Sequence, residues 1–459
     1  MARRIGPAAL ACAALALGTT ACFGTSSSGS SGGSSTAVAP AAVSTVDAAA
    51  QHEPVELEFW SNYSGAELPK YHQAFEGFTK QYPWITVKGT GGIDDAKIIA
   101  AINGGSPPDA LLSFSPDNTG KFCSSGAWLN LNDYIKQDGL DLSIFPPAGL
   151  QYSGYQGIQC SLPALADSYG LYYNKKVLAD AGYSDPPKTL TELAEMAKKL
   201  TVRKADGSLK QIGFNPIFGH YETFGDALRI AYGAPWFDAD GKPILSKDPK
   251  WAAMLQWQKD LVDWYGYENL QKFTAASADE FSADNDFEIG RVAMQYDGEW
   301  RNAFLRDEHP DIDYGTAPFP AAADHPEQYG AGTIGGDIVA IPKGAKHPAE
   351  AWLLIRYLAT DTDALVGLSN RLKNLPTTKD SLASPAIEPD PQFATFLQIF
   401  ANEKSEFNPL TPIGQEYSDT FGAFANRWQA GKVKDLRKGL EGLDQQITDQ
   451  LAQGAGSAP

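Results

Sequence analysis

The chain has 459 residues, of which 43% are hydrophobic and 20% are charged, and its formal net charge is −18. This length suffices for a large core and two domains, and the composition is that of a folded globular protein. A strongly negative chain without a long basic run is a poor partner for another polyanion, so we expect no nucleic-acid partner.

The N-terminus has the pattern of an export signal. Two arginines precede an apolar run over residues 8–17, which is too short to cross a bilayer comfortably. The small residues before Cys22 resemble the bacterial lipobox, in which the cysteine is acylated, although Thr19 stands where that motif prefers Leu. We predict a lipoprotein signal peptide over residues 1–21. The alternative is an ordinary secreted protein that is cut at the same place, with Cys22 incidental.

A Ser/Gly/Ala-rich stretch over residues 22–53 follows the signal and predicts a flexible tether. A tether directly after a lipidation site suits a protein that is anchored to the outer face of the cell membrane. We expect residues 454–459 to form a disordered tail.

Cysteine usage agrees with export. Cys12 lies within the signal, and Cys22 is the candidate anchor. Cys123 and Cys160 remain as an even pair in an oxidising compartment, which predicts a disulfide between them; two separate buried thiols are the alternative. The scattered cysteines and histidines have no metal-ligand spacing, so we expect neither a metal nor another cofactor.

The folded part begins with an alternation of strands and helices. Strands are predicted over residues 55–60, 85–87 and 110–114 from their apolar patterns, and helices over 68–82 and 95–103. This βαβαβ order indicates an α/β protein with a mostly parallel sheet that is covered on both faces.

Later elements continue the alternation. Residues 157–163 and 170–173 are predicted as two extended segments on either side of a loop, and Thr189 to Glu192 form a capping box that starts a helix through Leu200. Further strands are predicted over residues 291–296 and 336–342, and further helices over 249–265, 348–359 and 433–453.

Several predicted strands end in residues that are typical of polar-ligand recognition. In open α/β sheets, ligands lie beyond the carboxyl ends of the strands. Aromatic faces stack on the C–H faces of a sugar ring, and carboxylates and amides bind its hydroxyls. A single aromatic residue in such a place is more commonly part of the core, so the shared placement carries the prediction. The candidates are Trp60, Asn62, Ser113, Phe114, Ser115, Asp117, Asp167, Tyr169, His220, Tyr221, Glu222, Trp236, Phe237, Asp297, Glu299, Trp300, Arg301, Gly335, Gly336 and Asp337.

An ordered set of short motifs resembles one known family, the carbohydrate-binding extracellular solute-binding proteins of ABC importers, in the branch of maltose-binding protein. The motifs cover nearly all of residues 54–453 in the order of that family. They are Phe59-Trp60, Gly104 to Asp109, Gly126 to Leu131, Gly170 to Lys175, Pro186 to Leu193, Gly290 to Met294 with Gly298 to Trp300, and Pro348 to Trp352.

The resemblance implies a periplasmic-binding-protein-like fold with two lobes, each a mostly parallel sheet flanked by helices, joined by a hinge. We place lobe 1 at residues 54–164 and 337–382, and lobe 2 at residues 165–336 and 383–453. The chain then crosses between the lobes more than once.

The resemblance also implies roles for individual residues. Trp300 matches an aromatic residue that stacks on sugar, and Asp167 matches an acidic hydroxyl acceptor. Arg371 and Asn374 lie in a loop that often borders the cleft in the family. Asp117 lies near an Asp-Arg pair of maltose-binding protein, but the match requires a gap and the Arg is absent, so the maltose-specific pattern is not reproduced.

These observations predict a monomeric, lipid-anchored receptor that captures a sugar or oligosaccharide and delivers it to the permease subunits of an ABC importer. We do not expect an enzyme. The first alternative is an extracellular glycosidase or lyase that uses two carboxylates among Asp167, Asp297 and Glu299. The second is a binding protein for another solute, such as a peptide or polyamine.

Overall fold

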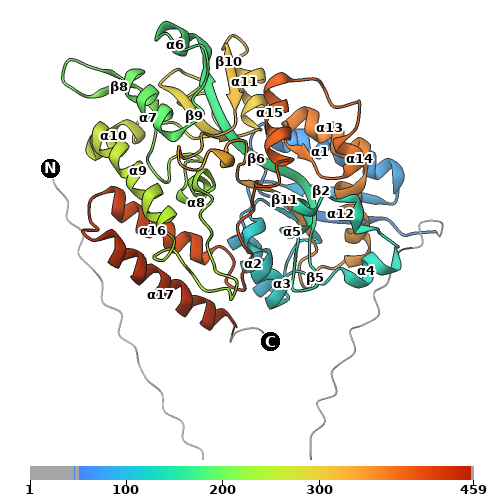
Figure 1. Ribbon diagram of the computed structural model, residues 1–459. Helices are drawn as coiled ribbons and strands as arrows, with labels where there is room; N and C mark the ends of the chain where they lie inside the picture. Colours follow the sequence, from blue (N-terminus) through green and yellow to red (C-terminus); the bar gives the residue numbers. More distant parts are fainter. Residues whose placement is uncertain (1–45, 47–50, 456–459) are drawn as a thin grey trace, which may run out of the picture. The chain divides into compact units, whose positions relative to one another are not determined.

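The computed structural model of the protein describes Val46 and residues 51–455 (Figure 1). The signal peptide, Cys22 and nearly all of the tether that the sequence predicts lie outside these residues, so they stay predictions. Within the described part of the chain, no helix has the length and apolar character needed to cross a membrane.

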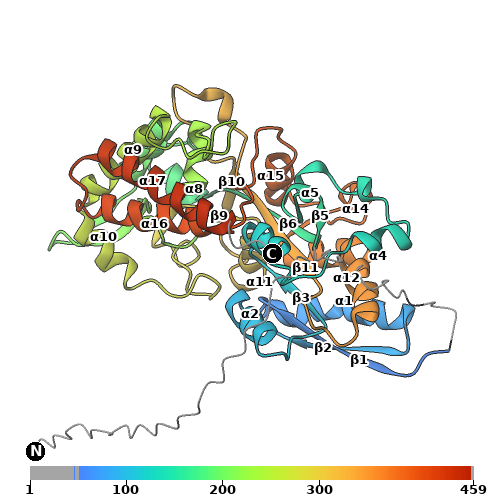
Figure 2. The same cartoon turned by 90° about the horizontal axis from the view of Figure 1, so that it is seen from below.

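The first three strands are parallel neighbours (Figure 2). β1 (Val55–Ser61) pairs with β2 (Ile85–Thr90) on one side and with β3 (Ala110–Ser113) on the other. α1 (Glu67–Gln81) and α2 (Asp95–Asn103) provide the crossover connections. The predicted βαβαβ order is confirmed.

The 13-residue strand β6 (Leu162–Asn174) organises the middle of the sheet. It pairs antiparallel with β11 (Ile334–Ala340) along its first half and with β9 (Val292–Gly298) along its second, and β10 (Tyr314–Ala317) and β12 (Leu375–Pro376) also pair with it. The predicted loop between two extended segments is wrong here. The strand is continuous because β9 becomes its partner at the residue after β11 ends.

The strand order of the large sheet is β2-β1-β3-β11-β6-β9-β8-β7, in which β8 is Leu209–Phe214 and β7 is Val202–Arg203. Parallel pairs lie in β2-β1-β3 and in β8-β9, and antiparallel pairs surround β6. A separate hairpin joins β4 (Gly154–Tyr155) and β5 (Ile158–Gln159).

Helices flank the sheet. The capping box is confirmed, because the Thr189 hydroxyl and the Glu192 carboxylate each bond to the backbone amide of the other at the start of α7. The α-helices after α2 are α3 (Thr119–Ser125), α4 (Asn132–Gln137), α5 (Pro147–Gln151), α6 (Lys175–Asp180), α7 (Leu190–Lys199), α8 (Gly225–Leu228), α9 (Pro249–Tyr265), α10 (Tyr267–Thr274), α11 (Arg301–Glu308), α12 (Pro348–Thr360), α13 (Thr362–Leu372), α14 (Lys379–Leu382), α15 (Pro391–Phe400), α16 (Glu416–Gln429) and α17 (Leu436–Ala455).

Two large hydrophobic clusters make up most of the core. The first, core A, draws on residues 57–165 and 339–372. The second, core B, draws on residues 171–322 and 413–447. Strand β6 contributes side chains to both clusters, so the middle of the strand lies between the two cores.

The predicted disulfide is confirmed. Cys123 in α3 is bonded to Cys160, just before β6, with an S–S distance of 2.07 Å and a Cα–Cα distance of 5.5 Å. The bond ties α3 to the start of the strand that contributes to both cores.

Candidate functional site

A cavity of about 570 Å³ borders the middle of β6, and we call it the β6 cavity. Its wall is built from the loop after β3, from β6, from the start of β11 and from the segments around residues 218–227 and 407–426. The sequence-predicted residues that it brings together are Phe114, Asp117, Asp167, Tyr169, Glu222, Gly335 and Gly336. Residues from distant parts of the chain therefore meet here, although Asp167 and Tyr169 lie within the continuous strand β6 and not in the loop that the sequence predicts.

Asp167 is held in place by an amide and a second carboxyl. The Nδ2 atom of Asn374 donates to Asp167 Oδ1 at 2.7 Å and to Glu299 Oε1 at 3.1 Å. The backbone N–H of Ser168 donates to Glu299 Oε2 at 2.8 Å. Burial, and then the neighbouring Asp167, raises the pKa of Glu299 well above its usual range, and burial raises the pKa of Asp167. Glu299 and Asn374 thus position Asp167 at the cavity wall.

A second buried carboxyl belongs to Asp337, which is 2% exposed. The Tyr63 hydroxyl donates to Asp337 Oδ2 at 2.6 Å. Burial and the charge of Asp167 raise the pKa of Asp337 well above its usual range. Asp337 therefore joins β11 to the loop after β1 and does not line the β6 cavity.

Two glycines open the cavity wall where β11 meets β6. Gly336 has φ +149°, and a Cβ atom there would stand 2.3 Å from the carbonyl oxygen of Leu165. A Cβ atom on Gly335 would meet no atom within 4 Å. Gly336 is thus required for the close approach of the two strands, whereas Gly335 leaves the wall bare.

Trp300 lies against the wall but is not part of it. Trp300 is 8% exposed, and its ring contacts the ring of Tyr169 edge-on at a centroid distance of 5.4 Å. The indole also lies so close to Gly298 that a Cβ atom on that glycine would stand 2.2 Å from it. Its Nε1 atom has no hydrogen-bond partner among the described residues. Of the two rings, Tyr169 is the one that lines the cavity, and sugar stacking by Trp300 stays a prediction.

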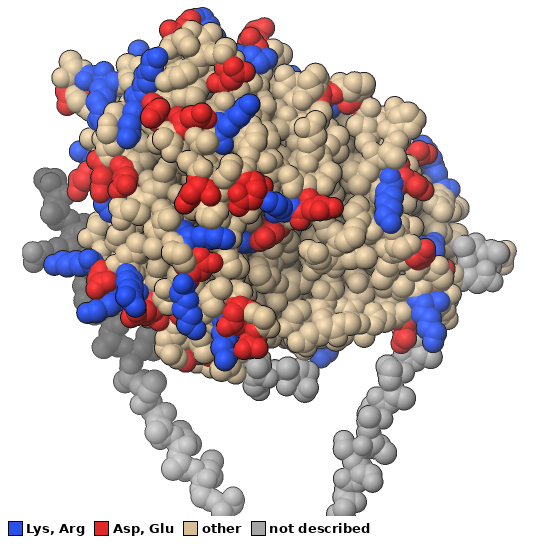
Figure 3. All heavy atoms as spheres, viewed as in Figure 1, with Lys and Arg blue, Asp and Glu red and all other residues tan. Residues whose placement is uncertain are grey.

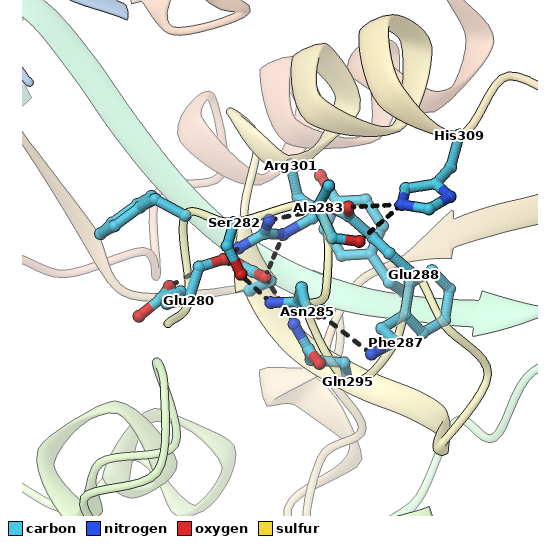
Figure 4. Close-up of polar contacts among 12 residues, drawn as sticks. Glu280, Ser282, Ala283, Asn285, Phe287, Glu288, Gln295, Arg301 and His309 are labelled. Atoms are coloured by element: carbon cyan, nitrogen blue, oxygen red, sulfur yellow. Dashed lines mark hydrogen bonds and ion pairs between the residues drawn. The ribbon is translucent and has the colours of Figure 1, made fainter. Parts of the chain in front are cut away.

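Arg301 is placed differently from the sequence prediction. It is fully buried, and its guanidinium group pairs with Asp297 at 2.8 Å and with Glu288 at 2.9 Å (Figure 4). A further N–H group donates to the backbone oxygen of Glu280 at 2.9 Å. Arg301 and Asp297 therefore hold the segment of residues 280–288, and neither reaches the cavity.

The remaining predicted residues near β1 and β3 support the wall. The Asn62 side chain accepts from the backbone N–H of Phe114 at 3.0 Å, and the Ser113 hydroxyl accepts from that of Ser115 at 3.0 Å. Trp60 packs into a small hydrophobic cluster beside α2 and α3. The Asn62 bond positions Phe114, which is 41% exposed.

Five predicted residues lie away from the cavity wall. Trp236 is 1% exposed within core B, where its Nε1 atom donates to Asn408 at 3.1 Å, and Phe237 packs against the same core. The Tyr221 hydroxyl donates to the oxygen of Ala278 at 3.1 Å, with the His220 ring stacked on Tyr221. Arg371 donates to the backbone oxygen of Lys70 at 3.2 Å. These aromatic and cationic side chains therefore pack or form hydrogen bonds within the protein and do not face the cavity.

A comparison with protein families identifies the chain. The family described as "Bacterial extracellular solute-binding protein" matches residues 64–364, which is more than half of the 459 residues. The chain belongs to this family.

Individual proteins that are similar in sequence or in structure support this family assignment. The maltotriose-binding protein of Pyrococcus abyssi (strain GE5 / Orsay) is 25% identical over 400 residues, which are 86% of this chain and 82% of the relative. The maltooligosaccharide ABC transporter solute-binding lipoprotein of Streptococcus pneumoniae (strain ATCC BAA-255 / R6) is 24% identical over 339 residues, 71% of each chain. The solved structure of CpMnBP1 with mannotriose bound has a TM-score of 0.77 at 26% identity, covering 85% of this chain and 99% of that one. The fold is the two-lobed, periplasmic-binding-protein-like fold that the sequence predicts.

Sequence reasoning missed part of the wall of this extracellular solute-binding protein. Helix α16 contributes Asp419, Phe421 and Asn426 to it, and the preceding segment contributes Phe407. A signal was present, because Tyr417, Phe421, Phe424 and Trp428 recur at helical spacing and are buried. Phe224 was also missed, and no local pattern marks it; it is 45% exposed and lines the cavity.

Proposed function

We propose that this solute-binding protein captures a sugar or oligosaccharide in the β6 cavity and delivers it to the permease subunits of an ABC importer. The observation that carries the proposal is the pairing of Asp167 with Tyr169 on one wall, a hydroxyl acceptor beside an aromatic face. The names of the relatives that bind maltotriose, maltooligosaccharide and mannotriose support it.

The chemistry of the wall suits hydroxylated rings. The oxygens of the Asp167 carboxyl group accept hydrogen bonds from sugar hydroxyls, and the Asn426 amide both donates and accepts. The rings of Tyr169 and Phe114 offer apolar faces for the C–H side of a sugar. Because Asp167 is already fixed by Asn374, little ordering cost remains when the ligand binds.

Closure of two lobes provides the mechanism. We propose that the lobes have the boundaries given by the sequence, residues 54–164 with 337–382 and residues 165–336 with 383–453. A ligand that contacts both lobes favours the closed state by its differential affinity for that state. The permease then recognises the closed form.

We further propose that Cys22 is acylated, so that the monomeric protein is held at the outer face of the cell membrane by residues 22–53. Metabolic labelling with a fatty acid tests this, with Cys22→Ser as the variant that loses the label. Label retained on the Cys22→Ser protein would contradict the anchor.

Calorimetric titration of the purified protein with mono-, di- and trisaccharides tests the binding function. We expect saturable binding of at least one saccharide, and loss of that binding in Asp167→Asn. The proposal is wrong if peptides bind and saccharides do not. Release of new reducing ends from an oligosaccharide by the protein would instead favour the glycosidase alternative.

A further inference from the structure

The segment over residues 198–210 is basic, although the chain as a whole is acidic. Five of its residues are cationic and one, Asp206, is acidic. The cations are Lys198, Lys199, Arg203, Lys204 and Lys210. In a chain with a formal net charge of −18, solubility does not require such a local excess of cations, which indicates a negatively charged partner.

A cavity of about 630 Å³ is lined by this segment and by α10, and we call it the basic cavity. Lys204, Lys210 and Lys272 line it and form no ion pair with any residue that the structure describes. Arg291 and Asp284 line it as well, but Arg291 is already paired with Asp286 at 2.6 Å. The wall therefore holds three unpaired lysines and one acid.

Large apolar side chains stand exposed beside these cations. Ile289 lines the basic cavity and is 44% exposed, and Val202 in β7 is also 44% exposed. Trp264, near the end of α9, is 40% exposed. Its ring centre lies 5.4 Å from the Arg203 guanidinium group and 6.0 Å from the Lys198 ammonium group. Exposed apolar side chains of this size are typical of an interaction surface.

Hydrogen bonds to the backbone connect Trp264 with the basic cavity. The backbone oxygen of Tyr265 accepts from Arg203 and from Asn269, each at 3.2 Å, and Asn269 lines the cavity. Arg203 also donates to the backbone oxygen of Gly207, in the turn between β7 and β8, at 3.2 Å. The cavity, Val202, Arg203 and Trp264 thus form one continuous surface, which we call the β7–β8 surface.

The acids near the β7–β8 surface do not cancel its charge. Asp263, next to Trp264, is paired with Lys259. The acids that remain are Glu195, an exposed residue on α7, Asp206, Glu268 and Asp284. Six cations without an ion pair among the described residues outnumber them, namely Lys198, Lys199, Arg203, Lys204, Lys210 and Lys272. The surface therefore keeps an excess of positive charge.

The β7–β8 hairpin projects from the body of the molecule (Figure 1, Figure 2). Figure 3 shows Lys and Arg side chains, with acidic side chains among them, at the upper left, where Figure 1 places α7 and β8. A projecting, basic element with an indole beside it is accessible to a partner much larger than a sugar.

An anionic lipid surface matches both the cations and the apolar side chains. Each Lys or Arg held near a negatively charged membrane increases the affinity roughly five-fold. An indole favours the boundary between headgroups and acyl chains, where its ring is in an apolar layer and its N–H group is hydrated. An acidic protein would pair with the lysines, but it offers Trp264 and Val202 no such layer.

We propose that the β7–β8 surface docks on an anionic lipid membrane. Lys204, Lys210 and Lys272 receive the headgroup phosphates, and Trp264 and Val202 enter the headgroup region. This docking goes beyond sugar capture and does not depend on which sugar is bound. The proposed tether of residues 22–53 would keep the surface close to the membrane, so that a weak affinity suffices.

Co-sedimentation of the mature protein with lipid vesicles tests this proposal. The protein carries Cys22→Ser, so that no acyl chain can bind the vesicle. We expect binding to phosphatidylcholine vesicles with about 30% phosphatidylglycerol to be at least ten-fold tighter than to phosphatidylcholine alone. That binding should be lost as NaCl is raised from about 50 mM to about 500 mM. Equal binding to the two kinds of vesicle, or binding to neither, would overturn the proposal.

Variants test which residues make the contact. We expect the triple variant Lys204→Glu, Lys210→Glu and Lys272→Glu to bind no better than it binds to phosphatidylcholine, and Trp264→Ala to bind at least three-fold more weakly than the parent. The control makes the same change in charge at three exposed lysines elsewhere, Lys136→Glu, Lys432→Glu and Lys434→Glu, and should lose at most two-fold. Circular dichroism confirms that each variant is folded. An equal loss in the two triple variants would overturn the proposal, because net charge alone would then explain the binding.

Competition distinguishes a membrane from other anions. We expect neither inorganic phosphate nor poly-L-glutamate, at the same concentration of negative charge as the vesicles, to displace half of the bound protein. Displacement by poly-L-glutamate that is lost in the lysine variant would assign the surface to an acidic protein. Displacement by phosphate, together with no effect of Trp264→Ala, would assign it to a small anion. Either result would overturn docking on a membrane.

Discussion

At the scale of single residues, the β6 cavity depends on an aromatic ring and a carboxylate that stand next to each other. Tyr169 lines the cavity and contacts Trp300 edge-on, and Asp167 is fixed by Asn374. Two residue-scale predictions follow from these contacts, one for the ring and one for the amide.

Replacement of Tyr169 by Ala removes the ring that lines the cavity. We expect the affinity for the bound saccharide to fall by about 1–3 kcal/mol, the burial energy of a large side chain. Tyr169→Phe keeps the ring and should bind nearly as tightly as the parent protein. Calorimetry measures both, and equal affinity of the Ala variant and the parent would show that the ring makes no ligand contact.

Replacement of Asn374 by Leu removes the donor that serves both Asp167 and Glu299. We expect the free energy of unfolding to fall by about 1–3 kcal/mol, because buried acceptors lose their partner. Asn370→Leu is the control, since that amide bonds to backbone atoms of Ala386 and Glu388 instead. Urea unfolding measures both, and an equal loss in the two variants would contradict the role of Asn374.

Several residues of the site were chosen from sequence by a strand-end argument that holds only for the loop after β3. Asp167, Tyr169 and Gly335 line the cavity, but they lie within β6 and β11 and not beyond a strand end. Arg301 was mistaken because its partners Glu280 and Glu288 come from a loop that no local pattern links to it. Burial of a charge is decided by such partners, which the sequence alone does not reveal.

At the scale of elements, the approach of β11 to β6 forms the cavity wall. Gly335 and Gly336 are neighbours in β11 but differ in their surroundings, since only Gly336 faces the backbone of β6 closely. Substitutions at these two glycines therefore allow an effect on fold stability to be separated from an effect on ligand binding.

We expect Gly336→Ala to destabilise the fold, because the new methyl group would stand 2.3 Å from the oxygen of Leu165. Gly335→Ala should leave the melting temperature unchanged, because nothing lies within 4 Å of its Cβ position, yet it should alter ligand affinity by narrowing the cavity. Thermal unfolding and calorimetry separate the two effects. Equal melting temperatures for both variants would contradict this account of the strand contact.

Elements with strong local signals were predicted well, and those defined by long-range pairing were not. The helix over residues 249–265 agrees with α9 (Pro249–Tyr265) to the residue. The continuity of β6 was missed because its two halves are joined by a change of partner, from β11 to β9, that only the tertiary structure supplies.

At the scale of the whole molecule, buried carboxyls connect stability to pH. Burial raises the pKa of Glu67 from 4.5 to about 7 and that of Glu280 from 4.5 to about 8. Between pH 4.5 and these values the folded state holds protons that the unfolded state has released, so stability falls as pH rises. The charged groups that face them are Glu222, Asp279, Asp297 and Arg301 for Glu280, and Lys70, Asp167 and Arg301 for Glu67.

We therefore expect the melting temperature of the ligand-free protein to decrease between pH 5 and pH 8, with each group contributing at most about 1.4 kcal/mol per pH unit. Glu280→Gln should make the decrease shallower, whereas Glu195→Gln should not. Calorimetric scans at several pH values measure this. A melting temperature that rises across this range would show that the carboxyls are ionised in the folded protein.

The two-lobed fold was predictable from sequence because the motifs appear in the family's order along nearly the whole chain. The ligand was not, because it depends on how side chains such as Glu222 and Asp419 converge from separate segments. Convergence of this kind is a property of the assembled fold.

The segments of the two cores alternate along the chain, and this order has a consequence for recombination between homologous genes. Core A is built from residues 57–165 and 339–372, and core B from residues 171–322 and 413–447. A single recombination point between two homologous genes leaves at least one core with segments from both parents, wherever between these segments it falls. New ligand preferences in such a receptor are thus more readily reached by point substitutions at the cavity wall than by exchange of a lobe.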